Sequence, residues 1–255
     1  MNGYELETKN IGIQFGGLKA VSGVDFRARK GEITAIIGPN GAGKTTLFNL
    51  IVGFYKPTTG QVFFQGQDVT GLKTYQRTEL GMVRTFQNIN LFKDLSVMDN
   101  ILVGMHCRTK SGFMSCLAHT PASLREDKAS REKCMGILEF MNLHGYADEK
   151  ASSLSYGMQK NLEVARALAS DPKLILLDEP ASGLNTQDLD ELSRRIVGIR
   201  DRGVTVVLIE HKMDVVMSIS DHIMVLSFGQ KIAEGTPDQV SNDQAVIEAY
   251  LGKDD

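Results

Sequence analysis

The chain has 255 residues, of which 28 are basic and 31 acidic, so its formal net charge is −3. A hydrophobic content of 42% and a charged content of 23% are typical of a globular protein and exclude a disordered, collagen-like or coiled-coil chain. The nearly balanced charge argues against a protein whose main role is to bind nucleic acid, and three cysteines are too few for a disulfide framework.

The apolar runs of the chain are short and interrupted by charged residues, well below the roughly 20 residues that a membrane-spanning helix needs. Residues 1–5 lack the basic stretch and apolar stretch of an export signal. We therefore expect a soluble, cytosolic protein that serves a membrane only by docking to another protein.

The first part of the chain carries short alternating segments. Residues 11–15 and 61–65 alternate apolar and polar side chains between glycines, which predicts an antiparallel β subdomain. From about residue 97 to 170 the pattern is helical, apart from an interruption rich in Ser, Gly and Thr at 109–121. Apolar residues recur every three or four positions from Leu154 to Ala169, which predicts one amphipathic helix ended by Asp171 and Pro172.

Three continuous apolar runs, residues 33–37, 174–177 and 204–209, are too short for helices. Continuous rather than alternating runs are typical of parallel strands that helices cover on both faces. Each run ends in polar residues, and ligands of open parallel sheets bind beyond the carboxyl ends of the strands. We therefore expect the chemistry of the protein at those three ends.

A phosphate-binding loop follows the first of these strands and precedes a helix predicted at 46–52. The motif G-x-x-x-x-G-K-[ST] is matched without a mismatch by Gly38, Pro39, Asn40, Gly41, Ala42, Gly43, Lys44 and Thr45, with Thr46 next. Glycines allow the backbone N–H groups to surround a phosphate, and the helix N-terminus favours its negative charge. Lys44 would contact the β- and γ-phosphates, and the Thr45 hydroxyl would coordinate Mg²⁺. The alternative is a chance glycine-rich turn, which the strand and helix on either side argue against.

The other two strands end in acidic residues and a histidine. Asp178 is a hard anion suited to Mg²⁺, and Glu179 is a candidate general base for the attacking water. His211 could donate a hydrogen bond to the γ-phosphate. Two adjacent acids can also be a solvated turn, and a lone histidine is often structural, but the phosphate-binding loop at the same edge favours the functional interpretation.

Five motifs in order give the chain a resemblance to ABC-type ATPases, the nucleotide-binding subunits of ATP-binding cassette transporters. They are the phosphate loop, Gln87 within residues 84–87, Leu154 to Gln159, residues 174–180 with the loop 182–185, and His211. The resemblance covers about residues 6–252. It implies an α/β fold: a P-loop NTPase (RecA-like) core with a mostly parallel sheet, an antiparallel β subdomain and an α-helical signature subdomain at roughly 90–170. We expect these parts to form a single ABC ATPase domain, residues 1–255.

The resemblance also implies a hydrolytic mechanism with ATP and Mg²⁺ as cofactors. Gln87 would contact the metal ion and the water, and link them to the membrane partner. Phe15 would stack on adenine, although a Phe in an alternating strand is about as often part of the core. Ser155 and Gly157, at the start of a helix, would bind the γ-phosphate held by the other subunit of a head-to-tail dimer.

Two departures from the family pattern concern the dimer. Tyr156 and Met158 stand in place of a Gly and the Gln of the usual Leu-Ser-Gly-Gly-Gln signature, which puts the strength of the dimer in question. Asn185 replaces the usual Asp of the interface loop, which puts the polar contacts of that loop in question. Neither change removes a residue expected in hydrolysis, so we predict an active ATPase.

Further segments, including residues 15–21, 53–57, 233–237 and 246–252, resemble the ATP-binding subunit of bacterial branched-chain amino acid importers. This implies Leu, Ile and Val uptake with two permease subunits, a second ABC ATPase that is a paralogue, and indirectly a periplasmic binding protein. The subunit would lie peripherally on the cytoplasmic face of the inner membrane. The alternatives are a related ABC system such as lipopolysaccharide export, an ABC ATPase acting on DNA or ribosomes, and a nucleotide-binding regulator without hydrolysis.

Overall fold

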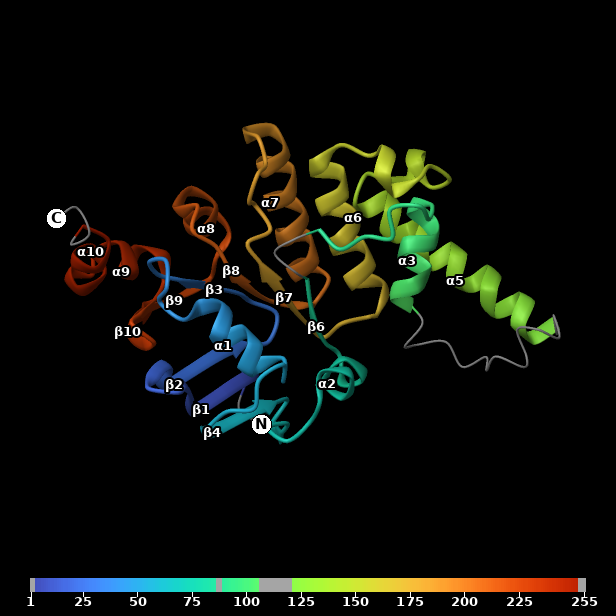
Figure 1. Cartoon of the computed structure of the whole chain (residues 1–255). Coiled ribbons are helices and arrows are strands. Elements are labelled where there is room, and N and C mark those ends of the chain that lie inside the picture. Colours follow the sequence, from blue (N-terminus) through green and yellow to red (C-terminus); the bar gives the residue numbers. More distant parts are fainter. Residues whose placement is uncertain (1–2, 86–88, 106–120, 252–255) are drawn as a thin grey trace. The chain divides into compact units, whose positions relative to one another are not determined.

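The structure of the chain, a computed structural model, describes residues 3–85, 89–105 and 121–251 (Figure 1). The chain divides into two compact units. The first combines residues 1–84 with residues 173–255, and the second consists of residues 85–172.

A six-stranded sheet forms the centre of the first unit. Its strand order is β10-β9-β3-β8-β7-β6, and every neighbouring pair is parallel except β9 and β10. The strands are β3 (Ile33–Ile37), β6 (Met82–Arg84), β7 (Leu174–Asp178), β8 (Thr205–Ile209), β9 (His222–Ser227) and β10 (Gln230–Gly235). All residues of β3, β7 and β8 are buried, which confirms the parallel strands predicted from the three continuous apolar runs.

The N-terminal segments of this unit form a four-stranded antiparallel sheet in the order β2-β1-β4-β5. The strands are β1 (Tyr4–Phe15), β2 (Leu18–Arg29), β4 (Thr59–Phe64) and β5 (Gln67–Asp68). The buried side chains of Phe26, Val62 and Phe64 belong to the same apolar cluster as Leu47 and Phe48 of helix α1 (Lys44–Ile51). The prediction of an antiparallel β subdomain is therefore confirmed.

Helix α2 (Thr74–Leu80) holds the C-terminal end of α1 through a buried arginine. The guanidinium of Arg77 donates hydrogen bonds to the carbonyls of Leu50 at 3.0 Å, Thr70 at 3.1 Å and Leu72 at 3.2 Å, and also to that of Ile51. Burial lowers the pKa of Arg77 to about 10, so the group remains charged at neutral pH. A cation at this position is favoured by the negative end of the helix dipole.

The remaining helices of the first unit are α7 (Thr186–Asp201), α8 (Met213–Ile219), α9 (Pro237–Ser241) and α10 (Gln244–Leu251). Helix α7 buries Leu192, Ile196 and Ile199 at helical spacing, while its polar residues stay at the surface. Pro237 at the first turn of α9 and the capping box between Thr236 and Gln239 explain where that helix begins.

The second unit is helical, as predicted for residues 97–170. It contains α3 (Val97–Met105), α5 (Pro121–Phe140) and α6 (Tyr156–Ala169), and two short 3₁₀ turns precede α6. A Cβ atom at Gly104 would lie 2.2 Å from the carbonyl oxygen of Arg166, so α3 and α6 approach too closely for any larger residue. The predicted interruption at 109–121 lies outside the described residues, except for Pro121, which begins α5.

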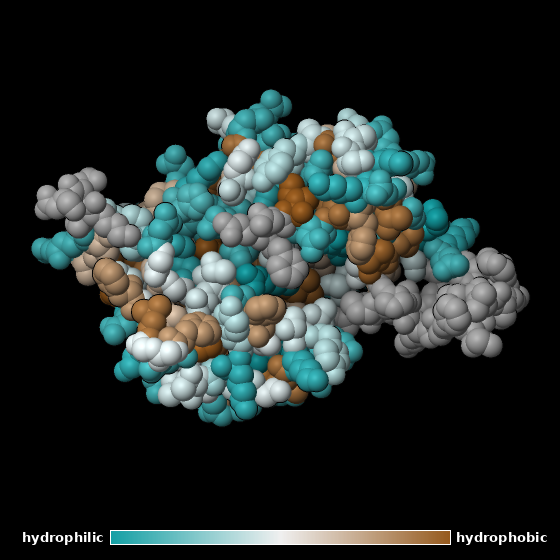
Figure 2. Space-filling model, viewed as in Figure 1, coloured by the Kyte–Doolittle hydropathy of each residue, from teal (hydrophilic) through white to brown (hydrophobic). Residues whose placement is uncertain are grey.

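The surface drawn in Figure 2 is mostly polar, with apolar residues in separate small groups. Within the described part of the chain, none of the helices combines the length and the apolar character needed to cross a bilayer.

Candidate functional site

The carboxyl ends of β3, β8 and β7 lie at one edge of the sheet. Ile36 of β3 is paired with Ile209 of β8, and Ile209 is paired in turn with Asp178 of β7. The glycine-rich loop at 38–43 follows β3, Glu179 follows β7, and Glu210 and His211 follow β8. The sheet register therefore brings together the three strand ends at which the sequence predicts the chemistry.

The loop after β3 depends on its glycines. Gly38 has φ 147° and Gly43 has φ 99°, conformations that other residues rarely adopt. A Cβ atom at Gly38 would lie 2.0 Å from the carbonyl oxygen of Leu226, and one at Gly43 would lie 2.5 Å from that of Ala20. The loop is thus packed against β9 and β2 with no room for larger side chains.

Lys44 is buried and folds back over this loop. Its ammonium donates hydrogen bonds to the carbonyls of Gly38 at 2.7 Å and Pro39 at 3.0 Å. Lys44 is the first residue of α1, so that helix begins two residues earlier than predicted, because Gly43 forms its N-cap in a left-handed conformation. A cation and a helix N-terminus at one point favour an anionic ligand.

Around Lys44 the loop is accessible. Asn40, Gly41 and Thr45 are exposed, whereas Ala42 is buried. The Ala42 N–H donates to the carbonyl of Pro39 at 3.1 Å, which closes the turn at the tip of the loop. A polyanion can therefore reach this backbone from solvent.

Asp178 is buried at the end of β7 and pairs with an arginine. Its Oδ2 atom lies 2.5 Å from Nη2 of Arg84, the last residue of β6, and the two side chains are 1% and 11% exposed. Nη1 of Arg84 donates to Oδ1 of Asn49 in α1, and the guanidinium lies 5.8 Å from the centre of the Phe48 ring. Arg84 is a residue of the site to which the sequence analysis assigned no role.

The second carboxylate oxygen of Asp178 tests whether a metal ion fits the site. Oδ1 is buried and has no hydrogen-bond partner among the described residues. An unsatisfied buried carboxylate oxygen is costly, and a hard divalent cation is a suitable partner for it. Thr45, a second predicted ligand, is exposed at the start of α1. These oxygen donors suit Mg²⁺.

Glu179 and His211 approach each other at the same edge. Oε2 of Glu179 lies 3.8 Å from Nδ1 of His211, and the side chains are 18% and 51% exposed. Glu179 has φ 48°, a left-handed conformation that costs a non-glycine residue about 1–3 kcal/mol. This conformation turns the chain away from the strand immediately after the buried Asp178, so consecutive acids have different surroundings.

Phe15, the predicted adenine platform, is 44% exposed at the end of β1 and is therefore not a core residue. Its ring forms an edge-to-face contact with Tyr55, with ring centres 5.3 Å apart, and Tyr55 makes a similar contact with Phe54 at 5.2 Å. An exposed ring held from one side by a second aromatic residue can stack on a planar ligand. The sequence analysis did not identify this support.

The signature residues Ser155 and Gly157 lie in the second unit, at the start of α6. Ser155 is the N-cap, and its hydroxyl accepts a hydrogen bond from the Met158 N–H at 3.4 Å. Gly157 is buried, whereas Tyr156 is 48% exposed. Tyr156 therefore adds an aromatic surface at this helix start without displacing the Ser155 cap.

Asn185 has a local role at the start of α7. Its side-chain oxygen accepts from the Asp188 N–H, and its amide nitrogen donates to Oδ2 of Asp188, both at 2.9 Å. An aspartate could make the first bond but not the second, because it has no donor when ionised. Gln87, the remaining predicted site residue, lies outside the described residues.

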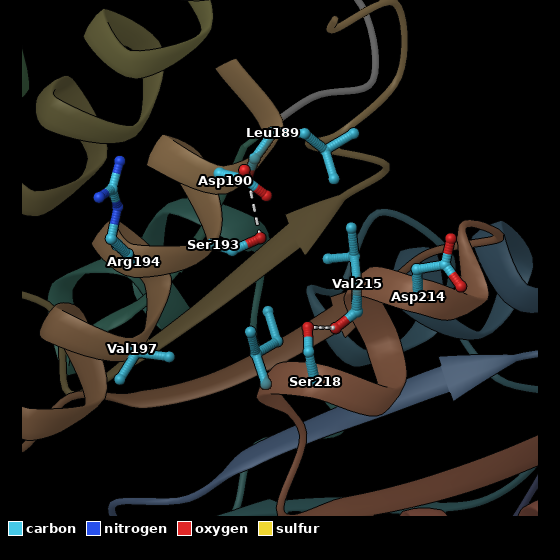
Figure 3. Close-up of a pocket in the computed structure, with 9 residues that line it drawn as sticks. Leu189, Asp190, Ser193, Arg194, Val197, Asp214, Val215 and Ser218 are labelled. Carbon is cyan, nitrogen blue, oxygen red and sulfur yellow. Dashed lines mark hydrogen bonds between the residues drawn. The ribbon is translucent and has the colours of Figure 1, made fainter. Parts of the chain in front are cut away.

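A separate pocket lies between α7 and α8, with a volume of about 680 Å³ (Figure 3). Its serine hydroxyls bond to their own helices, Ser193 to the carbonyl of Leu189 at 2.8 Å and Ser218 to that of Val215 at 2.9 Å. The described residues that line it include none of the predicted site residues. The pocket is therefore not part of the candidate site.

Comparisons with known proteins agree with the fold and with the family resemblance. Residues 21–182 match the ABC transporter family, and residues 230–255 match the family of branched-chain amino acid ATP-binding cassette transporters. A solved structure of an ATP-binding cassette of an ABC transporter, in its ADP conformation, superposes with a TM-score of 0.86 at 36% identity. The match covers 98% of this chain and 99% of that chain.

Two relatives are similar over almost their whole length. The chain is 43% identical over 249 residues to the high-affinity branched-chain amino acid transport ATP-binding protein BraF of Pseudomonas aeruginosa, covering 97% of this chain and 98% of that protein. Identity and coverage are the same for the high-affinity branched-chain amino acid transport ATP-binding protein LivG of Escherichia coli K12. The chain therefore belongs to the ABC transporter family, as one of its ATP-binding proteins.

Proposed function

We propose that the chain is the ATP-hydrolysing subunit of an importer that takes up leucine, isoleucine and valine across the cytoplasmic membrane. The observation that carries this proposal is the 43% identity, over 97% of the chain, to an ATP-binding protein of high-affinity branched-chain amino acid transport. The family match at residues 230–255 supports the same solute class and disfavours lipopolysaccharide export.

In this function the loop 38–43 and the start of α1 bind the phosphates of ATP. The Lys44 ammonium already lies among backbone carbonyls of the loop, at 2.7 Å from that of Gly38, so it can turn to the phosphates with a small movement. Thr45 and Thr46 lie in the first turn of α1 and would offer their hydroxyls to the phosphates and the metal ion, and Phe15 would stack on the adenine.

Thr45, Asp178 and Gln87 hold Mg²⁺ in this proposal. The bound ion would neutralise the charge that develops on the phosphate oxygens. Asp178 offers Oδ1 toward this role, while Arg84 holds Oδ2 at 2.5 Å and so fixes the carboxylate plane. Arg84 also compensates the Asp178 charge when the metal ion is absent.

Glu179 is the general base in this proposal and accepts a proton from the attacking water. Its side chain is 18% exposed, so water can reach it while part of its solvation is removed. His211, 3.8 Å from Glu179 and half-exposed, can donate a hydrogen bond to the γ-phosphate from the same edge. Glu179 thereby acts on the attacking water and His211 on the γ-phosphate in the same hydrolytic step.

The protein works within a larger assembly in this proposal. A second ABC ATPase, a paralogue of this chain, binds head to tail, so that Ser155 and Gly157 of each subunit contact the γ-phosphate held by the other. Two permease subunits hold the ATPases at the cytoplasmic face of the membrane and carry the solute across. A periplasmic binding protein delivers the solute to the permease subunits. The exposed N-cap hydroxyl of Ser155 is accessible for such a contact.

Uptake of radiolabelled leucine, isoleucine and valine tests the proposal in cells from which the gene has been deleted. We expect the deletion to reduce uptake of all three, the wild-type gene to restore it, and Lys44→Ala not to restore it although the variant protein accumulates. Uptake of lysine serves as the control, because its cationic side chain is of another class. Unchanged uptake of the three apolar amino acids in the deletion strain would contradict the proposed solute class.

A further inference from the structure

Glu210, the residue between β8 and His211, is a buried carboxylate to which the proposed mechanism assigns no role. It is 0% exposed. Its Oε1 atom accepts a hydrogen bond from the Ala181 N–H at 2.7 Å, and its Oε2 atom accepts from the N–H groups of His211 at 3.0 Å and Lys212 at 3.4 Å. Each carboxylate oxygen therefore binds a different loop.

The two loops are those that carry the proposed general base and the proposed histidine. Ala181 lies two residues after Glu179, in the turn that the left-handed conformation of Glu179 begins. At the start of this turn, the Glu179 N–H donates a hydrogen bond to the carbonyl of Ile209, the last residue of β8, at 3.0 Å. The turn is therefore held at both ends, once by the backbone of β8 and once by the side chain of Glu210, the residue that follows β8.

The chemistry of these contacts requires a carboxylate. Backbone N–H groups converge on both oxygens, and only an ionised carboxylate has two oxygens that both accept without carrying a hydrogen. A glutamine of the same shape would direct its NH₂ group at one of the N–H donors and would release one loop. Carboxylate acceptors also form stronger bonds to N–H groups than neutral ones do.

We propose that Glu210 is a positioning residue of the hydrolytic site, which holds the Glu179 turn and the His211 loop in fixed register. This inference rests on the proposed function of Glu179 and His211. Glu210 contacts neither of their side chains in the hydrogen bonds above. It acts through the backbone, so its removal changes the placement of Glu179 and His211 and leaves the loop 38–43 and Lys44, which bind the phosphates in the proposed function, in place.

The test is Glu210→Gln in the full chain, with ATP hydrolysis measured in steady state and in single turnover. We expect kcat to fall by about tenfold to a hundredfold, because a displacement of about 1 Å can cost that much. KM for ATP and the Kd of a fluorescent ATP analogue should stay near the wild-type values, because the hydrogen bonds to the Glu210 carboxylate come from Ala181, His211 and Lys212, whereas the phosphate loop follows β3. A general loosening of the structure would instead weaken nucleotide binding as well.

Asp221→Asn is the matched control. Asp221 is also a carboxylate that accepts from a backbone N–H, that of Ile33 at 2.8 Å, but at the opposite end of β3. We expect this variant to keep the wild-type kcat. If Glu210→Gln does not fold, as judged by its thermal melt, Glu210→Asp replaces it: the shorter side chain keeps the charge and the His211 contact but falls short of Ala181. A wild-type kcat in the folded Glu210 variant overturns the proposal.

The double variant with Glu179→Gln decides whether Glu210 acts through Glu179. We expect Glu210→Gln to add little further loss of single-turnover rate once Glu179 is replaced. Equal and independent losses in both backgrounds overturn the inference. A Glu179→Gln variant that hydrolyses ATP at the wild-type rate overturns the proposed general base, whereas an inactive Glu179→Gln beside a fully active Glu210→Gln overturns only the inference about Glu210.

Discussion

The two edges of the parallel sheet use similar side chains in different ways. At the amino edge, the Gly31 N–H donates to the Thr205 hydroxyl at 3.0 Å and the Ile33 N–H donates to Asp221 at 2.8 Å, while Arg200 lies 3.3 Å from Asp221. At the carboxyl edge, Asp178 keeps one buried oxygen without a hydrogen bond among the described residues, and Glu179 adopts a left-handed conformation. At the amino edge Thr205 and Asp221 have partners, although the buried hydroxyls of Thr34 and Ser220 have none among the described residues. At the carboxyl edge the unpartnered group is a carboxylate, and it stands directly before a strained acid.

This difference indicates where the molecule sacrifices stability for chemistry. An unpartnered buried carboxylate oxygen directly before a strained acid costs free energy, and such a combination is typical of a place where a ligand or a reaction uses it. We therefore expect substitutions at the carboxyl edge to reduce activity most, and those at the amino edge to reduce stability alone.

The largest effect is expected for Lys44→Ala at the carboxyl edge. Loss of a cation that contacts the transferring phosphate reduces hydrolysis by about a hundredfold to a thousandfold. The measurement is the steady-state rate of phosphate release with saturating ATP and Mg²⁺. The matched control is Lys173→Ala, because Lys173 precedes β7 at the amino edge and donates to Gln65 at 2.9 Å. Equal losses in the two variants would remove the distinction between the edges.

The second-largest effect is expected for Arg84→Ala, which should reduce both the stability and the activity of the protein. It leaves the 1% exposed Asp178 carboxylate without its cation, so we expect a loss of about 3–5 kcal/mol in the free energy of unfolding. Urea denaturation measures this loss. The double variant Arg84→Leu with Asp178→Leu removes both charges and should recover much of the stability while remaining inactive. If the double variant is no more stable than Arg84→Ala, the ion pair is not the reason for the loss.

Thr205→Val tests the amino edge. The substitution preserves the shape of a fully buried side chain but removes the acceptor for the Gly31 N–H. We expect a loss of about 1–2 kcal/mol in the free energy of unfolding and no change in kcat or in KM for ATP. A fall in kcat comparable to that of a carboxyl-edge variant would show that the two edges are not functionally distinct.

The contrast also separates what the sequence can predict from what it cannot. The strand at 33–37, the loop after it and the two acids after the run 174–177 are local patterns, so their place at one edge follows from the parallel sheet. The Arg84–Asp178 pair depends on β6 lying beside β7, and β6 has only three residues, too few for a periodic pattern. The support of Phe15 by Tyr55 likewise joins residues 40 positions apart, which no local pattern records.

The structure gives a physical reason for Asn185, which stands where the family pattern has an aspartate. Relative to the family pattern, Asn185 exchanges a charge for an amide, and the amide donates to Asp188 at 2.9 Å while its oxygen caps α7. Both polar atoms of the Asn185 side chain therefore bond to Asp188, within the first turn of α7.

Asn185→Asp gives the smallest predicted effect. The new carboxylate keeps the capping bond and is favoured by the helix dipole, but it loses the amide donor and faces the Asp188 carboxylate. These contributions oppose each other, so we expect the melting temperature to fall by no more than about 2 °C. Because like charges at the surface are screened by salt, the fall should shrink as the salt concentration rises to about 1 M. Asn185→Ala, which loses the cap itself, should melt lower and show no such salt dependence. If Asn185→Asp melted at a lower temperature than Asn185→Ala, the hydrogen bond from the Asn185 amide to Asp188, rather than the cap, would hold the start of α7.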